Sequence, residues 1–423
     1  MKYYRDIIVQ LARLGDLIQV WPLIASLNSR HGAGNTALVV DERLAEMAEL
    51  MVGSDNVVSL PINTLLYAGL NSKLKYQWKL AARTENELQK LRADRVINLN
   101  YHRASAAVAE AIPCANCIGA RWIDVVSDES SDHQFAEIFF ANTGSRSGVR
   151  HLSDIWRDYS GHEYIHNIDI LPVVDADSEL SNFSCMQLND DVRESGRQIL
   201  DNIGVYSDSS PIAVIPGAGM PERKWNIERW CEVIGELCHD YPVVLLGTNS
   251  DVALAEDIID GLKLNDSLKP VASLCGKTNL TQLAGVLSES RLTVGVDTGA
   301  LHLAAALGTA CLGIYYGSMH FRETGPYGNG HVVITPDDMS YPCHEHEMSS
   351  GDYINLHSIS GSAVIQTIRA MFEGRSCSPL GTVVYNSVLS TGGVSWRTEG
   401  ESEIKSHHLK NISRSQTLMA NAG

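Results

Sequence analysis

The chain has 423 residues, of which 44% are hydrophobic, and it carries a formal net charge of −17. A single hydrophobic core stops growing at roughly 250–300 residues, so we expect two domains. The excess of 50 acidic over 33 basic residues argues against a nucleic-acid partner, which requires clustered Lys and Arg.

The cysteines and the apolar runs bear on the compartment in which the protein works. There are nine cysteines, an odd number, and most lie within apolar stretches, which indicates free thiols in a reducing environment. No apolar run reaches the roughly 18 residues of a membrane span, and Arg13 and Asp16 interrupt any signal-peptide core. The sequence therefore predicts a cytoplasmic protein.

The first part of the chain has the pattern of a βαβ unit. Residues 6–11 form a short, β-branched apolar run typical of a buried strand, and residues 16–28 have helical apolar spacing, although Pro22 is awkward there. A strand over 36–40 follows, which implies parallel pairing and a right-handed crossover. Further elements are expected in the same domain, 1–180: strands at 57–60 and 95–99, and a helix at 84–91.

The pattern restarts after a polar linker at 171–191 and a helix at 190–203. Strands and helices again alternate, which predicts a second doubly wound domain over 190–358. Its expected strands are 212–215, 242–246, 292–296 and 310–315, and its expected helices are 227–238, 252–260, 280–288 and 300–307. Residues 359–423 are expected to contain a helix, a hairpin of 382–389 with 394–398, and a polar tail from about 399.

The predicted fold class is therefore α/β, with two Rossmann-like doubly wound domains that face a central cleft. Ligands bind outside the carboxyl ends of parallel strands, so the loops that follow the strands carry the candidate site. These loops are 12–16, 216–224, 247–251 and 297–302.

The loop after the first strand contains Arg13, Leu14, Gly15 and Asp16. Gly15 allows the backbone to approach a ligand closely. Asp16 can cap the following helix, or it can take a proton from a sugar hydroxyl at the mouth of the cleft. Local sequence favours neither role over the other.

The loop after strand 212–215 contains Pro216, Gly217 and Gly219, followed by Arg223 and Lys224. The glycine N–H groups can cradle a phosphate, and the two cations can stabilise a departing diphosphate. The alternative is a tight turn with two solvated cations.

A third segment runs from strand 292–296 into Asp297, Thr298 and Gly299 and then into an Ala-rich helix. The helix N-terminus would present free N–H groups to an anion. Asp297 can cap the helix or bond a ribose hydroxyl. His302 lies one turn into the helix and can be either a ligand contact or a packing residue.

Two other patterns suggest sites that we reject. The Gly32–Ala37 stretch matches the dinucleotide fingerprint GxGxxA, but it follows a helix and precedes a strand, the reverse of the required order. The pair Cys114 and Cys117 has no second pair, and the adjacent residues of Cys343–His346 cannot all point at one ion.

Taken together, these segments resemble glycosyltransferase family 9, the heptosyltransferase-like enzymes of bacterial surface-glycan assembly. The resemblance is carried by LARLGDLIQVWPLIASL (11–27), IPGAGMPERKWNIERW (215–230), VVLLGTNSDVALAEDI (243–258), LCGKTNLTQLAGVLSESRLTVGVDTGALHLAAALG (274–308) and TGPYG (324–328). It implies the GT-B fold and an inverting transfer that needs no metal or other cofactor. The implied partners are a nucleotide sugar and a glycan or lipid-linked acceptor, which adds the membrane periphery as a second expected location.

The resemblance also assigns roles to residues. It implies that Asp16 is the catalytic base and that Lys224 contacts phosphate. The implied donor contacts are Gly15, Pro216, Gly217, Gly219, Arg223, Asp297, Thr298, Gly299 and His302. An acidic or polar residue after Gly247 would hold the ribose, and both Asn249 and Asp251 are candidates. Residues 28–170 resemble the family weakly, so the acceptor stays open. A nucleotide-sugar epimerase and a non-catalytic sugar-nucleotide binding protein are the alternative functions.

Overall fold

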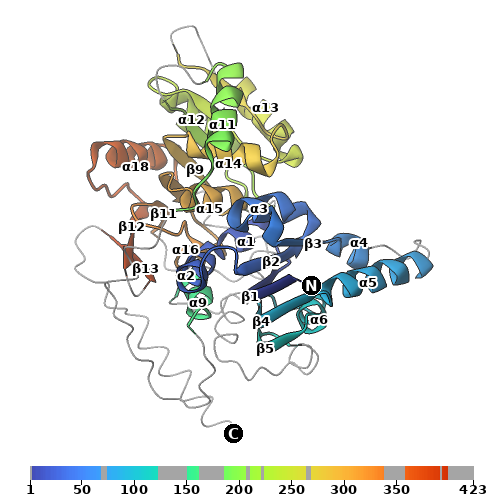
Figure 1. The fold of residues 1–423 in the computed structure, drawn as a ribbon. Coiled ribbons are helices and arrows are strands. Elements are labelled where there is room, and N and C mark those ends of the chain that lie inside the picture. Colours follow the sequence, from blue (N-terminus) through green and yellow to red (C-terminus); the bar gives the residue numbers. More distant parts are fainter. Residues whose placement is uncertain are drawn as a thin grey trace.

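The computed structural model describes residues 2–67, 74–121, 150–161, 185–205, 210–220, 223–262, 268–337, 358–390 and 393–398. Three sequence predictions lie outside these residues: most of the linker at 171–191, the segment Cys343–His346 and the polar tail from 399. In Figure 1 the N-terminal half, blue to teal, lies below the C-terminal half, green to orange.

The N-terminal half is built on a five-stranded parallel sheet with the order β3-β2-β1-β4-β5. Ile7 and Ile8 of its central strand point to opposite faces and are both fully buried, because helices cover both sides. The strands are β1 Lys2–Gln10, β2 Thr36–Asp41, β3 Val57–Leu60, β4 Leu91–Asn98 and β5 Cys114–Gly119. The helices are α1 Leu14–Ile18, α2 Trp21–His31, α3 Ala45–Val52, α4 Ile62–Tyr67, α5 Leu74–Leu88, α6 Arg103–Ala111 and α9 Leu152–Asp158, with short 3₁₀ turns at Glu42–Leu44 and Ser54–Asn56.

The C-terminal half is built on an eight-stranded sheet with the order β13-β12-β11-β10-β9-β6-β7-β8. Its strands are β6 Ile212–Ile215, β7 Val243–Leu245, β8 Val271–Ser273, β9 Leu292–Val296, β10 Cys311–Ile314, β11 Val332–Pro336, β12 Thr382–Ser390 and β13 Gly393–Arg397. The helices are α11 Asp190–Asn202, α12 Ile227–Leu237, α13 Val252–Gly261, α14 Leu280–Ser288, α15 Gly299–Ala306, α16 Phe321–Thr324 and α18 Gly361–Glu373, with a 3₁₀ turn at Asn249–Asp251. Two Rossmann-like sheets confirm the predicted fold class.

Two predicted helices differ from the observed ones. The single helix expected at 16–28 is two helices, α1 and α2, because Pro22 has no N–H to donate and therefore occupies the first turn of a new helix. The helix expected at 84–91 ends at Leu88, and β4 already begins at Leu91, whose side chain is buried against the sheet.

The predicted C-terminal hairpin is confirmed, and it extends the C-terminal sheet. Strand β12 pairs antiparallel with β11, and β13 pairs antiparallel with β12. The rings of Tyr385 and Trp396 pack on Phe321 at centroid distances of 4.6 and 5.2 Å. The hairpin thereby supports α16, which lies beside the candidate site described below.

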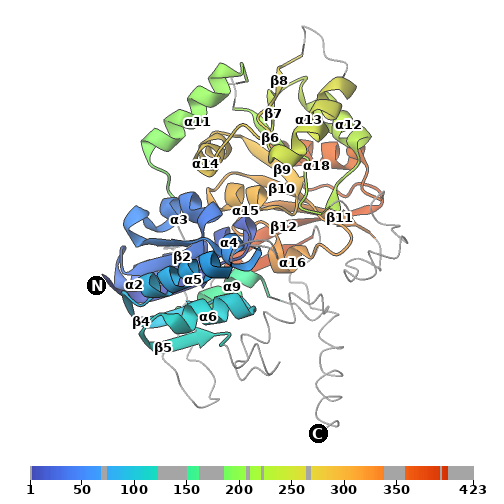
Figure 2. The ribbon, with the colours of Figure 1, turned by 90° about the vertical axis from the view of Figure 1, so that its right-hand side faces the viewer.

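The two halves meet in the centre and on two sides (Figures 1 and 2). In the centre, α1 packs against α15. On one side, the backbone N–H groups of Leu280 and Thr281 donate to the Glu46 carboxylate, at 3.2 and 3.1 Å. On the other side, the ring of His151 bonds the carbonyl of Gly325 at 2.9 Å. Within the parts of the chain that are described, no helix is long and apolar enough to cross a membrane.

Candidate active site

Asp16 lies where β1 ends and α1 begins, at the third position of the helix. One carboxylate oxygen accepts a hydrogen bond from the backbone N–H of Arg13 at 3.1 Å, so the predicted capping role is confirmed. The other oxygen accepts no hydrogen bond from the described residues, and it remains available to a ligand. Burial raises the pKa of Asp16, against the opposing effects of Arg13 and His302. A half-buried carboxyl with a raised pKa has the properties of a general base.

Two glycines allow the halves of the chain to touch beside Asp16. A Cβ on Gly15 would lie 2.9 Å from Cδ2 of His302 and 3.5 Å from Cα of Gly299. A Cβ on Gly299 would lie 2.9 Å from the backbone nitrogen of Gly15. The two distances of 2.9 Å are shorter than real Cβ contacts, so both positions favour glycine. The pair sets how closely Asp16 approaches the start of α15.

Asp297, at the end of β9, is surrounded by polar groups from four other segments. Its Oδ1 bonds Nε2 of His302 at 3.1 Å and the hydroxyl of Tyr315 at 3.3 Å. Its Oδ2 accepts from Thr324 Oγ1 at 3.3 Å and lies 3.9 Å from the Arg223 guanidinium. Burial raises the pKa of Asp297, but His302, Arg223 and Tyr315 together outweigh burial and hold it below the usual range. The carboxylate is therefore ionised and joins the loops instead of capping α15.

The N-terminus of α15 carries backbone donors for a ligand. The helix begins at Gly299, after the N-cap residue Thr298, whose side chain makes no capping bond. The hydroxyl of Thr298 is buried and has no hydrogen-bond partner among the residues described. An unpaired buried hydroxyl beside free helical N–H groups favours a bound anion at this position.

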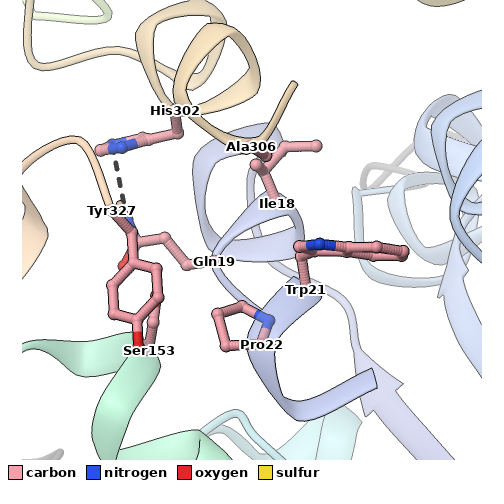
Figure 3. Close-up of a pocket in the computed structure, with 8 residues that line it drawn as sticks. All are labelled: Ile18, Gln19, Trp21, Pro22, Ser153, His302, Ala306 and Tyr327. Carbon is pink, nitrogen blue, oxygen red and sulfur yellow. Dashed lines mark hydrogen bonds between the residues drawn. The ribbon is translucent and has the colours of Figure 1, made fainter. Parts of the chain in front are cut away.

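A small pocket lies between the halves (Figure 3). Its lining residues come from α1, α2, α9, α15 and the loop after α16: Ile18, Gln19, Trp21, Pro22, Ser153, His302, Ala306 and Tyr327. His302 is 6% exposed and turns toward Gln19 of the opposite half. The histidine is thus part of the polar network around Asp297 and not an apolar packing residue.

The loop after β6 places the side chain of Arg223, and not that of Lys224, beside Asp297. Arg223 is largely buried near Asp297, and its carbonyl accepts from the hydroxyl of Tyr316 at 2.8 Å. Lys224 is exposed. Pro216 is buried, and Gly219 is exposed with open space around its Cα. The two cations therefore face different surroundings, although they are adjacent in sequence.

Gly217 has a structural reason to be glycine. A Cβ at this position would lie 2.4 Å from Oδ1 of Asp251. The other oxygen of Asp251 accepts from the N–H and the hydroxyl of Thr248, at 2.8 and 2.7 Å. The side chain of Asp251 therefore packs against the backbone of Gly217, whereas Asn249 is exposed.

Cys114 and Cys117 of the CxxC pair lie on β5, are partly buried and form no disulfide. Among the described residues, no group of three His, Cys, Asp or Glu side chains is placed to hold a metal ion.

Sequence reasoning missed Glu323 in α16, next to Thr324. Its side chain is 7% exposed, and its Oε1 has no hydrogen-bond partner in the described structure. Burial raises the pKa of the Glu323 carboxyl to about 8. Glu323 lies between Arg322 and Thr324, and nothing in this polar stretch of sequence indicates that its side chain is buried.

Glu323 leads to a prediction about stability. A carboxyl whose pKa is raised in the folded state contributes stability below its unfolded pKa of roughly 4.3, and this contribution is lost as pH rises toward 8. Glu323→Gln should therefore raise the melting temperature at pH 8–9 relative to wild type and leave it nearly unchanged at pH 5. Thermal melts across this range test it, with exposed Glu256→Gln as the control. Equal shifts at pH 5 and pH 9 would show that Glu323 is not protonated in the fold.

Comparison with known proteins relates the chain to one family of transferases. Residues 178–354 match the family model of glycosyltransferase family 9 (heptosyltransferase). The lipopolysaccharide core heptosyltransferase OpsX of Haemophilus influenzae is 28% identical over 124 residues, which are 29% of this chain and 35% of that protein. Lipopolysaccharide heptosyltransferase 1 of Pseudomonas aeruginosa is 31% identical over 134 residues, 31% of this chain and 36% of that protein.

Similar solved structures extend over most of the chain. A glycosyl transferase family 9 structure from Veillonella parvula has a TM-score of 0.66 at 21% identity, covering 88% of this chain and 98% of that one. The ADP-heptose heptosyltransferase II of E. coli has a TM-score of 0.62 at 17% identity, with 88% and 99% covered. These likenesses show the fold. The sequence matches span only 35–41% of the length of the first three curated relatives.

The two facing Rossmann-like sheets thus have the GT-B fold, and within that fold residues 178–354 are similar to glycosyltransferase family 9.

Proposed function

We propose that this chain transfers a sugar from a nucleotide-diphosphate donor to a hydroxyl of a glycan or lipid-linked acceptor, with inversion at the sugar carbon. The observation that carries the proposal is the meeting of Asp16 with the start of α15 across the Gly15–Gly299 contact. Heptose is the first sugar to test, because the similar proteins are named heptosyltransferases. In this proposal the protein takes part in the assembly of bacterial lipopolysaccharide at the cytoplasmic side of the membrane.

The proposed mechanism is one in-line displacement. Asp16 accepts the proton of the acceptor hydroxyl as that oxygen attacks C1 of the sugar, and the bond from C1 to the phosphate oxygen breaks. The diphosphate leaves with its electron pair, and its charge is met by the N–H groups of α15, the Thr298 hydroxyl and Lys224. These donors supply the stabilisation that a metal provides elsewhere, so we expect transfer to continue in EDTA.

Asp297 and Arg223 have a supporting part in this proposal. Because the lone pairs of Asp297 already accept from His302, Tyr315 and Thr324, the carboxylate holds the loops that form the donor site. The Arg223 guanidinium lies 3.9 Å from Oδ2 of Asp297 and partly neutralises this carboxylate. It also adds positive potential near the proposed diphosphate. Pro216, Gly217 and Gly219 would line the nucleotide side of the same site.

Lys224 gives a separate prediction. Hydrogen bonds to a charged group contribute about 1.5–3 kcal/mol, so Lys224→Ala should lower kcat/KM for the donor by about 10- to 100-fold. Lys269→Ala is the control, since this exposed lysine precedes β8 at the opposite end of the sheet. Steady-state kinetics with varied donor measure the effect. An unchanged kcat/KM would assign the phosphate contact to Arg223 instead.

Two assays test the proposal as a whole. A thermal-shift screen with ADP, UDP, GDP and CMP identifies the nucleotide, because a ligand bound to the native state raises the melting temperature. ADP-heptose is then incubated with and without lipopolysaccharide from a heptose-deficient strain. If the protein is a transferase, ADP is released only when the lipopolysaccharide acceptor is present. Turnover of the donor sugar without acceptor would indicate an epimerase, and binding without turnover would indicate a non-catalytic protein.

A further inference from the structure

One side chain of the pocket in Figure 3 belongs to the helix of Asp16 and reaches across to the other half of the molecule. Gln19 ends α1, three residues after Asp16, and its backbone N–H donates to the carbonyl of Gly15. Its side chain is 4% exposed. The amide end that faces His302 lies 3.4 Å from Nε2 of that ring.

The position of the proton on His302 follows from its partners. The Asp297 carboxylate is ionised and can only accept, so the ring nitrogen 3.1 Å from it must carry a hydrogen. A nitrogen that donates cannot also accept from the NH₂ group of Gln19. The oxygen and the nitrogen of a glutamine amide are told apart by their hydrogen-bond partners. The Gln19 amide must therefore turn its oxygen, Oε1, toward the His302 ring. The Nε2–H group is therefore shared by Asp297 Oδ1 and Gln19 Oε1.

We infer that Gln19 is a positioning residue for the reaction, which fixes His302 and Asp297 of the C-terminal half against the helix that carries Asp16. The inference rests on the proposed function for its kinetic consequence. Its physical basis is the buried hydrogen bond between residues 283 positions apart, one on the helix of the base and the other on the helix of the donor site. Gln19 itself touches no reacting atom in this account.

The charged surroundings of the pair determine what a change at Gln19 would do. The acidic and basic groups that act on Asp16, Asp297 and His302 come from α1, α9, the end of β9 and the 216–226 loop: Arg13, Asp16, His151, Arg223 and Asp297. Gln19 is a neutral acceptor among them. A carboxylate in its place would keep the bond to His302 and add a negative charge close to Asp16.

Two substitutions therefore separate positioning from packing. Gln19→Met keeps length and apolar bulk but has no acceptor, and it should lower kcat by about 10- to 100-fold with less than about a twofold change in donor KM. Gln19→Glu should retain more of kcat than Gln19→Met. It should also move the acid limb of the pH–rate profile upward, because its charge disfavours ionisation of Asp16. Gln198→Met, on the exposed face of α11, is the matched control.

A purely structural role predicts different results. Both variants would then melt at lower temperature, while kcat per folded molecule and the acid limb stayed as in wild type. That outcome would overturn the inference.

A second measurement is independent of any activity. Melting temperatures of Gln19→Met, His302→Asn and the double variant of the full chain form a double-mutant cycle. We expect the two changes to be non-additive, and additive effects would contradict the hydrogen bond itself. If the wild-type protein fails to transfer heptose from ADP-heptose, the proposed donor is wrong. The double-mutant cycle still tests whether Gln19 and His302 are hydrogen-bonded. If wild type transfers and Gln19→Met does so equally well, the positioning role is wrong and the proposed function stands.

Discussion

Asp16→Asn is expected to lower the rate of sugar transfer by roughly 10²–10⁴-fold, the usual contribution of a general base. The amide oxygen of Asn can still accept from the N–H of Arg13, so the start of α1 should keep its cap. Burial also disfavours the ionised form of Asp16, because it raises the pKa of this residue. The neutral variant should therefore melt no lower than wild type at pH 7.

The comparison needs three measurements on the same preparations: turnover with donor and acceptor, nucleotide affinity, and melting temperature. Asp257→Asn, an exposed residue of α13, is the control for the chemical change. Loss of turnover with retained nucleotide affinity supports the assignment. If Asp16→Asn turns over as fast as wild type, Asp16 only caps α1 and another group accepts the proton.

Gly15→Ala should have the second largest effect, a loss of turnover of roughly 10²-fold. The added methyl group would lie 2.9 Å from the His302 ring, so α1 and α15 must separate by several tenths of an ångström. A displacement near 1 Å between reacting groups is enough for about a 10²-fold loss. The same separation stretches the bond between Gln19 and His302. Kinetics measure the loss, and a crystal structure of the variant would show the shift.

Gly235→Ala is the matched control for this change. The residue lies within α12, and its added Cβ would have ordinary van der Waals contact with Leu262 at 3.8 Å. Alanine is a better helix former than glycine, so this variant should melt higher and keep full activity. Normal activity in Gly15→Ala would mean that the Gly15–Gly299 contact opens during the reaction cycle.

Local sequence predicted which loops carry the site residues, because apolar periodicity and turn residues set where each strand ends. Short apolar runs followed by glycine-containing loops placed Asp16, Gly217 and Asp297 at the ends of strands, where the structure has them. The dinucleotide-like glycines, Gly32 and Gly34, lie between α2 and β2, in the helix-then-strand order that the sequence indicated. At Pro22 the helical apolar spacing conflicted with the preference of proline for a first helical turn. The proline preference held, and the predicted helix is two helices.

The contacts within the site needed the three-dimensional arrangement. Gln19 and His302 are 283 residues apart, and no local pattern pairs them. Local sequence could not distinguish the surroundings of Arg223 from those of Lys224, because the directions of these adjacent side chains depend on the turn that precedes α12. The close approach of Asp251 to Gly217 and the burial of Glu323 likewise depend on neighbours that are distant in the sequence.

The pH dependence of transfer tests the central claim most directly. The rate with ADP-heptose and heptose-deficient lipopolysaccharide should fall on the acid side along a limb that lies above the ordinary Asp pKa of about 3.9, because burial raises the pKa of Asp16. The residual activity of Asp16→Asn should lack this limb. An identical acid limb in wild type and Asp16→Asn would contradict the account, because the titrating group would then not be Asp16.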